Sequence, residues 1–390
     1  MNIKKAIRLR FFAAALLTGC ILCACAAKEE IPEATAPETV PDTTAVTEQK
    51  PIEITDDLKK KESIPEKKAP EREIIDGQIR SFLTGEMVPA EIGTRRPLAV
   101  MISNDKEAAP HYGINRAGVI YEAPVEGAMN RFMAVIEDYD DLERIGSVRS
   151  CRTYYTYFAR EWDAVYAHFG QSTFALPYLD NVDNINGLKQ DGAFYRSSDK
   201  KSPHNAYTSG ERIRKYIDKL GYRDTYDKDY LAGNGHFQFA SASEPVNFEE
   251  ELSWEAYKVL PGYPYNKPWF EYNEEDGLYY RYQYGKEHMG NEAQLAVKNI
   301  IFQYCPTGHY ATTEYLNIGL HGDSYGYYFT NGRVRPVASK KDGEFDVTRY
   351  YDMDGNEIVL NPGKTWICII RADAFDKTEI YGKDGKLTNK

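Results

Sequence analysis

Several short motifs that mark enzyme and cofactor sites are missing from this sequence. It has no H-E-x-x-H zinc motif, no P-loop and no G-x-G-x-x-G dinucleotide loop. Such motifs supply metal ligands or the backbone N–H groups that hold phosphates. From motifs, the sequence therefore predicts no metal, no cofactor and no catalytic residue.

Cysteine is scarce where a disulfide framework would need it. Three of the six cysteines lie within the first 25 residues, which leaves Cys151, Cys305 and Cys368. Their spacing matches no zinc-binding pattern. Cys305 and Cys368 fall in predicted strands, so the sequence permits one disulfide but favours two buried free thiols.

Basic residues are fewer than acidic residues in this sequence, 48 against 59. The net charge is −11, whereas nucleic acids and anionic lipid headgroups require a basic surface. The composition therefore argues against both kinds of partner. Tyrosine is abundant, with 31 residues; it suits sugar and peptide surfaces, but half-buried strands use it equally well, and we favour that explanation.

The first 25 residues predict an export signal with a lipid-attachment site. Lysine and arginine within the first ten residues precede an apolar run that continues to Ala24. The run is too short to cross about 30 Å of hydrocarbon. Leu22–Cys25 fits a lipobox, and Cys25 is the preferred lipidation site because polar sequence starts soon after it. Cys20 is the second choice, and an ordinary secretion signal is the alternative. We expect a lipid anchor on the outer face of the bacterial cytoplasmic membrane.

Residues 26–78 predict a disordered tether. The segment is rich in Pro, Thr, Glu and Lys and almost free of aromatic residues, so it cannot bury enough apolar surface to fold. Such a coil spans on the order of 40 Å, and a stretched chain up to roughly 150 Å. We expect a plain spacer.

The remainder predicts an α+β fold in two parts. An α/β layered domain is expected over 79–240, and a smaller, mostly antiparallel β domain over 246–375. Apolar runs and helical spacing in the first part predict strands at 98–104, 118–125, 130–138 and 163–170, and helices at 150–161, at 209–222 and from about Ser172.

The second part consists of short strands separated by Gly, Asn and Asp. Residues 330–333 and 352–356 have the chemistry of hairpin turns. The second of these contains Asp-Met-Asp-Gly but lacks the further carboxylates of a calcium loop, so it predicts a turn rather than a metal site.

The chain resembles a known family along nearly its whole exported region. The matching segments are RRPLAVMISN (95–104), the run 117–138, the run 145–170, FYRSSDKKSPHNAYTS (194–209), NIIFQYCP, YGYYFTNGRV and NPGKTWICII. These resemble the YerB family of bacterial lipoproteins. The resemblance implies a lipid anchor and two consecutive domains, and it implies no reaction. Cys151 and Thr153 stand where that family is expected to have Ala and Pro, so neither side chain should be essential.

Polar residues gather at the ends of the apolar runs in the first part. In α/β sheets, ligands usually bind at the ends of strands. We therefore expect a ligand-binding site among these side chains: Asn104, Glu122, Glu126, Arg131, Arg149, Arg152, His168, His204 and Asn205.

Two of these residues, Arg149 and Arg152, bracket the predicted start of a helix. A carboxylate or phosphate there would meet two guanidinium groups and the positive end of the helix. The alternative is that each arginine pairs internally with Glu122, Glu126 or Asp163.

The two candidate histidines differ in context. His168 lies within an apolar strand, where a hydrogen-bonded core residue is the usual finding. His204 lies in a polar Ser-Pro-His-Asn segment after a basic stretch that includes Arg196. If His204 approached His168 and Glu126, a metal or acid–base site would be feasible.

Three functions remain open from the sequence. The favoured one is a binding or interaction module for a cell-wall glycan, a peptide or an envelope protein. The alternative is a hydrolase of cell-wall material, with Glu126 and His204 as acid and base. The third is an assembly scaffold that uses edge strands of the β domain.

Overall fold

The structure is a computed structural model that describes residues 72–233, 235–249 and 252–389. The predicted signal, Cys20, Cys25 and most of the predicted tether lie outside these residues. Among the described helices, none has the length and apolarity needed to cross a membrane.

Both parts of the chain contribute to one 11-stranded mixed sheet, in the order β12-β22-β21-β18-β25-β4-β5-β3-β7-β8, with β23 paired to β22. The first part supplies β3 (Leu98–Ser103), β4 (Val119–Pro124), β5 (Asn130–Ile136), β7 (Val165–His168) and β8 (Asn184–Asn186). The second part supplies β12 (Trp254–Glu255), β18 (Asn299–Cys305), β21 (Gly322–Thr330), β22 (Arg333–Lys341), β23 (Arg349–Tyr351) and β25 (Thr365–Arg371).

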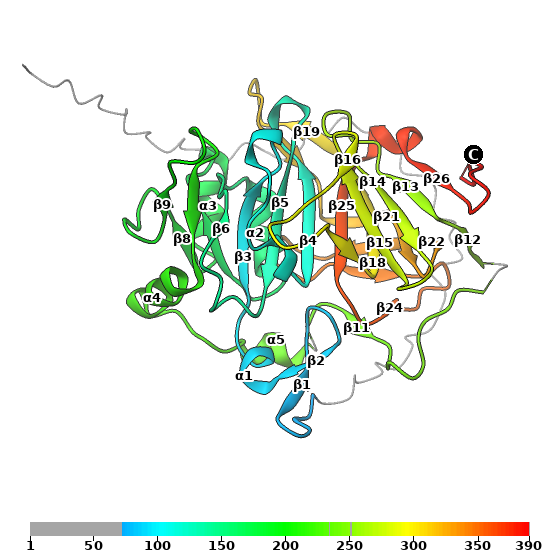
Figure 1. Cartoon of the computed structure of the whole chain (residues 1–390), viewed down its shortest axis with the longest axis horizontal. Helices are drawn as coiled ribbons and strands as arrows, with labels where there is room; N and C mark the ends of the chain where they lie inside the picture. Colours follow the sequence, from blue (N-terminus) through cyan, green and yellow to red (C-terminus); the bar gives the residue numbers. More distant parts are fainter. Residues whose placement is uncertain (1–71, 234, 250–251, 390) are drawn as a thin grey trace, which may run out of the picture. The chain divides into compact units, whose positions relative to one another are not determined.

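Strand β25 joins the two parts. Figure 1 shows it between β4 and β18, and it runs parallel to both, with Thr365 opposite Val119 and Asn299. A late segment of the chain therefore completes the sheet that the first part begins. The predicted α+β class, with a layered first part and a mostly antiparallel second part, is confirmed. The boundaries at 240 and 246 stay a prediction.

The central sheet is apolar on both faces because its strands alternate between two cores. In β3, Leu98, Val100 and Ile102 belong to one core, whereas Ala99 and Met101 belong to the other. The first core also contains residues of helix α4 (Gly210–Leu220) and of a second sheet. The other core contains residues of helix α2 (Thr153–Arg160).

The second sheet is antiparallel and has six strands. They are β13 (Lys258–Leu260), β14 (Trp269–Asn273), β15 (Leu278–Gln283), β16 (Lys286–Glu287), β17 (Ala296–Val297) and β26 (Glu379–Tyr381). The smaller elements are β1 (Gln78–Arg80), β2 (Met87–Pro89), α1 (Ala90–Gly93), β6 (Ile145–Gly146), α3 (Leu176–Leu179), β9 (Tyr195–Arg196), β10 (Ala206–Thr208), α5 (Lys228–Ala232), β11 (Gln238–Phe239), β19 (Thr307–His309), β20 (Leu316–Ile318) and β24 (Val359–Leu360).

Local chemistry explains the ends of the best-predicted elements. The Ser209 hydroxyl accepts from the Arg212 N–H at the start of α4, and Gly221 ends that helix with a φ of 67°, a conformation that glycine adopts without strain. Thr330 pairs with Arg333 in the β21–β22 hairpin. The three described cysteines are free and buried, so the expected buried thiols are confirmed.

Candidate functional site

A cavity of about 300 Å³ lies beside the carboxyl ends of the parallel strands β7 and β8. Phe169, Gly170 and Gln171 follow β7, and Leu188 follows β8; all four line the cavity. The sequence placed a ligand site at the ends of strands, which is where open α/β sheets usually bind ligands.

Arg149 is one of two guanidinium groups on the cavity wall. Its Nη1 donates to the Pro203 carbonyl at 3.0 Å. Burial and the nearby Arg152 charge lower the pKa of Arg149, but an arginine keeps its proton at neutral pH. No carboxylate among the described residues forms an ion pair with it, so its charge is left for solvent or a ligand.

Arg196, on β9, is the second guanidinium of the cavity. Its Nη1 donates to Asn205 Oδ1 at 2.7 Å. Its Cζ lies 4.9 Å from the centroid of the Phe169 ring. Within the described part of the chain, it too has no carboxylate partner. The sequence analysis left Arg196 out of the candidate site, although the basic stretch beginning at this residue was a usable signal.

One loop orients both guanidinium groups. Residues 197–205 connect β9 to β10, and Ala206 pairs with Arg196 in that hairpin. The loop supplies the Pro203 carbonyl to Arg149 and the Asn205 side chain to Arg196. Asn205, a predicted site residue, therefore acts on the cavity through Arg196.

Two further arginines surround Arg149. Arg131 is only 7 % exposed, and its Nη1 donates to the Ser150 carbonyl at 2.6 Å. Burial, Arg152 and Arg149 lower the pKa of Arg131 to about 10. Arg152 forms a two-bond ion pair with Glu126, with Nε–Oε1 at 2.7 Å and Nη2–Oε2 at 2.6 Å. This corner of the protein therefore carries an excess of positive charge.

Arg149 and Arg152 do not act as the expected pair at the start of a helix. Arg152 precedes α2 directly, but it is absent from the cavity lining because its fork is engaged by Glu126. Internal pairing, the alternative from the sequence, applies to Arg152 and not to Arg149.

Glu122 and Asn104 lie in the protein core instead of at the cavity. The Glu122 carboxylate accepts from Arg281 Nη2 at 2.7 Å and from Trp366 Nε1 at 3.1 Å. It also accepts from three amide side chains: Asn130 at 3.0 Å, Asn266 at 3.1 Å and Asn104 at 3.4 Å. These contacts connect the two parts of the chain.

Two histidines extend the Glu122 network. His288 Nδ1 lies 2.5 Å from Arg281 Nη1, and its Nε2 lies 2.9 Å from His111 Nδ1. Burial and then Arg281 lower the pKa of His111 to about 3, and they hold the pKa of His288 well below its usual value. The sequence did not reveal this pair because 177 positions separate the two residues.

His168 is a hydrogen-bonded core residue. Its Nδ1 lies 2.8 Å from the Gly170 carbonyl and its Nε2 lies 3.2 Å from Asn184 Oδ1. Burial lowers its pKa. The ring therefore contacts the loop after β7, which forms the cavity wall, while His168 itself does not line the cavity.

His204 has other partners than Glu126. Its Nδ1 lies 3.4 Å from Ser103 Oγ, and its Nε2 lies 3.8 Å from Asp105 Oδ1. A serine, a histidine and an aspartate thus come together, but 3.8 Å is too long for a hydrogen bond and Ser103 does not line the cavity. Within the described residues, no group of three or more His, Cys, Asp or Glu side chains is arranged to hold a metal ion.

One motif was overlooked in the sequence. Gly322–Gly326 fits the pattern G-x-S-x-G, which in hydrolases forms a sharp turn between a strand and a helix. Here it lies inside strand β21, and the Ser324 hydroxyl donates to the Tyr304 carbonyl. The segment therefore lacks the turn that would expose a nucleophile.

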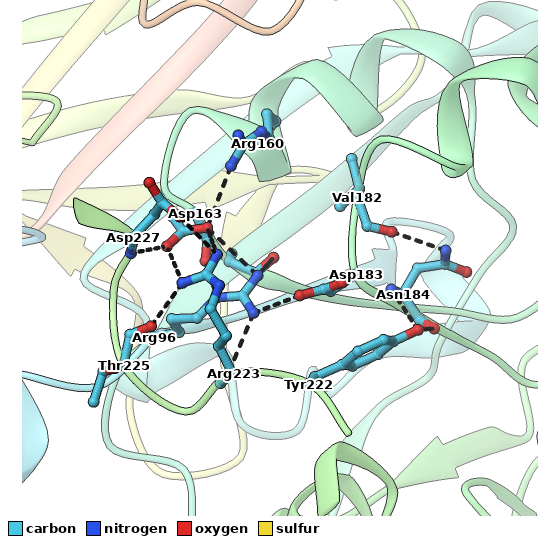
Figure 2. A network of polar contacts seen from close by, with 11 residues as sticks. Arg96, Arg160, Asp163, Val182, Asp183, Asn184, Tyr222, Arg223, Thr225 and Asp227 are labelled. Carbon is cyan, nitrogen blue, oxygen red and sulfur yellow. Dashed lines mark hydrogen bonds and ion pairs between the residues drawn. The ribbon is translucent and has the colours of Figure 1, made fainter. Parts of the chain in front are cut away.

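A charge network centred on Asp163 braces the other end of β7. Figure 2 shows Arg96, Arg160 and Arg223 gathered around this buried carboxylate, with N–O distances of 3.5, 3.3 and 2.9 Å. Arg96 also pairs with Asp183 at 2.6 Å. The network uses neither Arg149 nor Arg152, so those two arginines do not pair with Asp163.

Comparison with known proteins agrees with this architecture. A family described as "Protein of unknown function (DUF3048) N-terminal domain" matches residues 83–223. Its C-terminal counterpart matches residues 260–367, and together the two ranges cover more than half of the chain. The chain belongs to the DUF3048 family. All the cavity-lining residues fall within the N-terminal match.

The YerB protein of Bacillus subtilis supports the resemblance drawn from the sequence, both by its sequence and by its structure. "Putative lipoprotein YerB" of Bacillus subtilis (strain 168) is 29% identical over 305 residues, which cover 75% of this chain and 86% of that protein. The crystal structure of the YerB protein from Bacillus subtilis matches with a TM-score of 0.66 and 28% identity, over 76% of this chain and 98% of that one. The predicted YerB resemblance is confirmed.

Proposed function

We propose that this DUF3048 protein is a lipid-anchored binding module that presents an anion site in the cell envelope. The observation that carries the proposal is the cavity lined by Arg149 and Arg196, two oriented guanidinium groups with no carboxylate partner among the described residues.

The charge distribution supports a ligand at this cavity. Most arginines of the described part pair with an aspartate or glutamate, as the chain's net charge of −11 would suggest. Within the described residues, seven arginines form no such pair: Arg72, Arg80, Arg131, Arg149, Arg196, Arg212 and Arg333. Of these seven, Arg149 and Arg196 are the two that line the cavity. Guanidinium groups in a fixed orientation bind carboxylates and phosphates through two parallel hydrogen bonds, so an anion is the expected occupant.

The location of the protein supports an envelope ligand. A DUF3048 relative carries the name of a lipoprotein, and the predicted signal ends in a lipobox at Cys25. A lipid anchor with a tether of about fifty residues would carry the cavity on the order of 40 Å from the membrane. Peptides and anionic polymers of the cell wall carry carboxylates or phosphates and are therefore within reach.

The test is calorimetric titration of acetate and of inorganic phosphate into the full chain purified in detergent. We expect saturable binding that Arg149→Ala or Arg196→Ala weakens by about tenfold, the loss of one charge-assisted hydrogen bond. Arg371→Ala is the matched control, because Arg371 pairs with Asp373 on the surface. This substitution removes the same charge at a site away from the cavity. Equal binding by all variants would refute the proposal.

A further inference from the structure

We infer that the cavity accepts a carboxylate that carries an apolar group, as the C-terminal residue of a peptide does, in preference to a phosphate. This inference rests on the anion binding proposed above and names the chemical class of the ligand.

The backbone around the cavity is the first reason. Phosphate sites are commonly built from free backbone N–H groups. Here the N–H groups of Arg149 and Phe169 donate to the carbonyls of Met101 and Arg149. Those of Gly170 and Leu188 both donate to Asn186 Oδ1. These four amides therefore donate within the protein, whereas no acceptor within the described residues takes the N–H groups of Ser150 and Gln171. Two N–H groups can assist the guanidinium groups, but they do not form the run of amides that encloses a phosphate.

The guanidinium groups are the second reason. Each has one N–H fixed by the loop 197–205, which leaves a planar fork with a set direction. Two such forks, together with the Ser150 and Gln171 side chains of the lining, match the two coplanar oxygens of a carboxylate. The same forks can hold two oxygens of a phosphate, but its remaining oxygens would then face the apolar part of the lining.

The apolar part of the lining is the third reason. Phe169, Leu188 and Pro203 face the same cavity as the two arginines, and Leu188 is 66% exposed. A phosphate has no apolar group with which to cover such surface, so it gains nothing from it. An apolar side chain next to a carboxylate would instead cover it and gain roughly 25 cal/mol per Å² of buried apolar area.

The size of the cavity fits a chain end. A volume of about 300 Å³ lies at the lower limit for ligand pockets. It suits one residue with its terminal carboxylate, while the rest of a peptide would extend into solvent.

The test compares three probes on the full chain in detergent: N-acetyl-Ala-Ala-Leu with a free carboxylate, the same peptide as its C-terminal amide, and inorganic phosphate. We expect the acid to bind about tenfold more tightly than the amide or phosphate, which corresponds to one charge-assisted hydrogen bond. Leu188→Ser should weaken the acid peptide several-fold and leave acetate binding unchanged. Arg149→Lys, which keeps the charge but removes the fork, should weaken the peptide and acetate alike.

The contradicting results separate the two claims. If phosphate binds as tightly as the acid peptide, or if the amide peptide binds as tightly as the acid peptide, the inferred ligand class is wrong. Anion binding by Arg149 and Arg196 is then decided separately by the acetate titration. If neither acetate, phosphate nor peptide binds, both claims are refuted.

Discussion

Replacing Glu122 by glutamine should destabilise the whole protein, because it leaves a buried arginine without its carboxylate partner. Glu122 and Arg281 are both fully buried, and their N–O distance is 2.7 Å. Arginine is not deprotonated in proteins, so Arg281 would remain charged and buried in the variant. Removal of one partner of a buried ion pair typically costs about 3–5 kcal/mol, and the nearly identical shape of glutamine leaves packing intact.

The assay is urea denaturation of the full chain, followed by tryptophan fluorescence and circular dichroism. With a slope of about 3 kcal/mol per M, a loss of about 3–5 kcal/mol lowers the midpoint by roughly 1–1.7 M. Glu122 lies on β4 and Arg281 on β15, in different parts of the chain, so both probes should report one earlier transition.

A surface pair provides the control. Lys383 and Glu274 are each more than half exposed, and such exposed pairs contribute little to stability, so Lys383→Met should leave the midpoint nearly unchanged. A Glu122→Gln loss below about 1 kcal/mol, or a loss confined to one of two separate transitions, would refute the reasoning.

Three further predictions follow from individual contacts. Burial raises the pKa of Glu161, but Lys341 and His236 outweigh it and hold that pKa at about 2. The stabilisation by this carboxylate should therefore be complete above its ordinary pKa of 4.5 and be lost as pH falls from there toward 2. In Glu161→Gln, the free energy of unfolding should fall less steeply with pH over this range. An unchanged slope of this free energy against pH would contradict the prediction. Asn205→Ala should weaken acetate binding several-fold by releasing Arg196, without lowering the free energy of unfolding by more than about 1 kcal/mol; an unaltered affinity would show that Arg196 needs no such support. Burial raises the pKa of the Cys151 thiol to about 12, so a thiol reagent should modify it only in the denatured protein, and rapid labelling under native conditions would show that the site opens.

The sequence was informative wherever a signal is local. The apolar run 98–104 became β3, and Ser209 with Gly221 marked the ends of α4, because strand runs and helix caps depend on neighbouring residues. The position of β25 beside β4 was not predictable, because this strand pairing joins residues that are 246 positions apart in the sequence, and periodicity carries no information about pairing partners.

The candidate site shows the same limit at the level of side chains. The sequence identified Arg149 and Asn205 by residue type and by their place at the ends of apolar runs. It could not show that Glu122 forms an ion pair with Arg281 in the core, or that Glu126 forms one with Arg152. Arg196 was missed because its side chain reaches the cavity only through the fold of the β9–β10 hairpin.

The most direct test of the central claim is to follow the Arg Nε–H signals of the full chain by NMR during titration with acetate. The account predicts that the signals of Arg149 and Arg196 shift together and saturate, while those of Arg214 and Arg371, which are paired with Asp224 and Asp373, stay in place. No saturable shift at Arg149 and Arg196, or equal shifts at all four arginines, would contradict an anion site in this cavity.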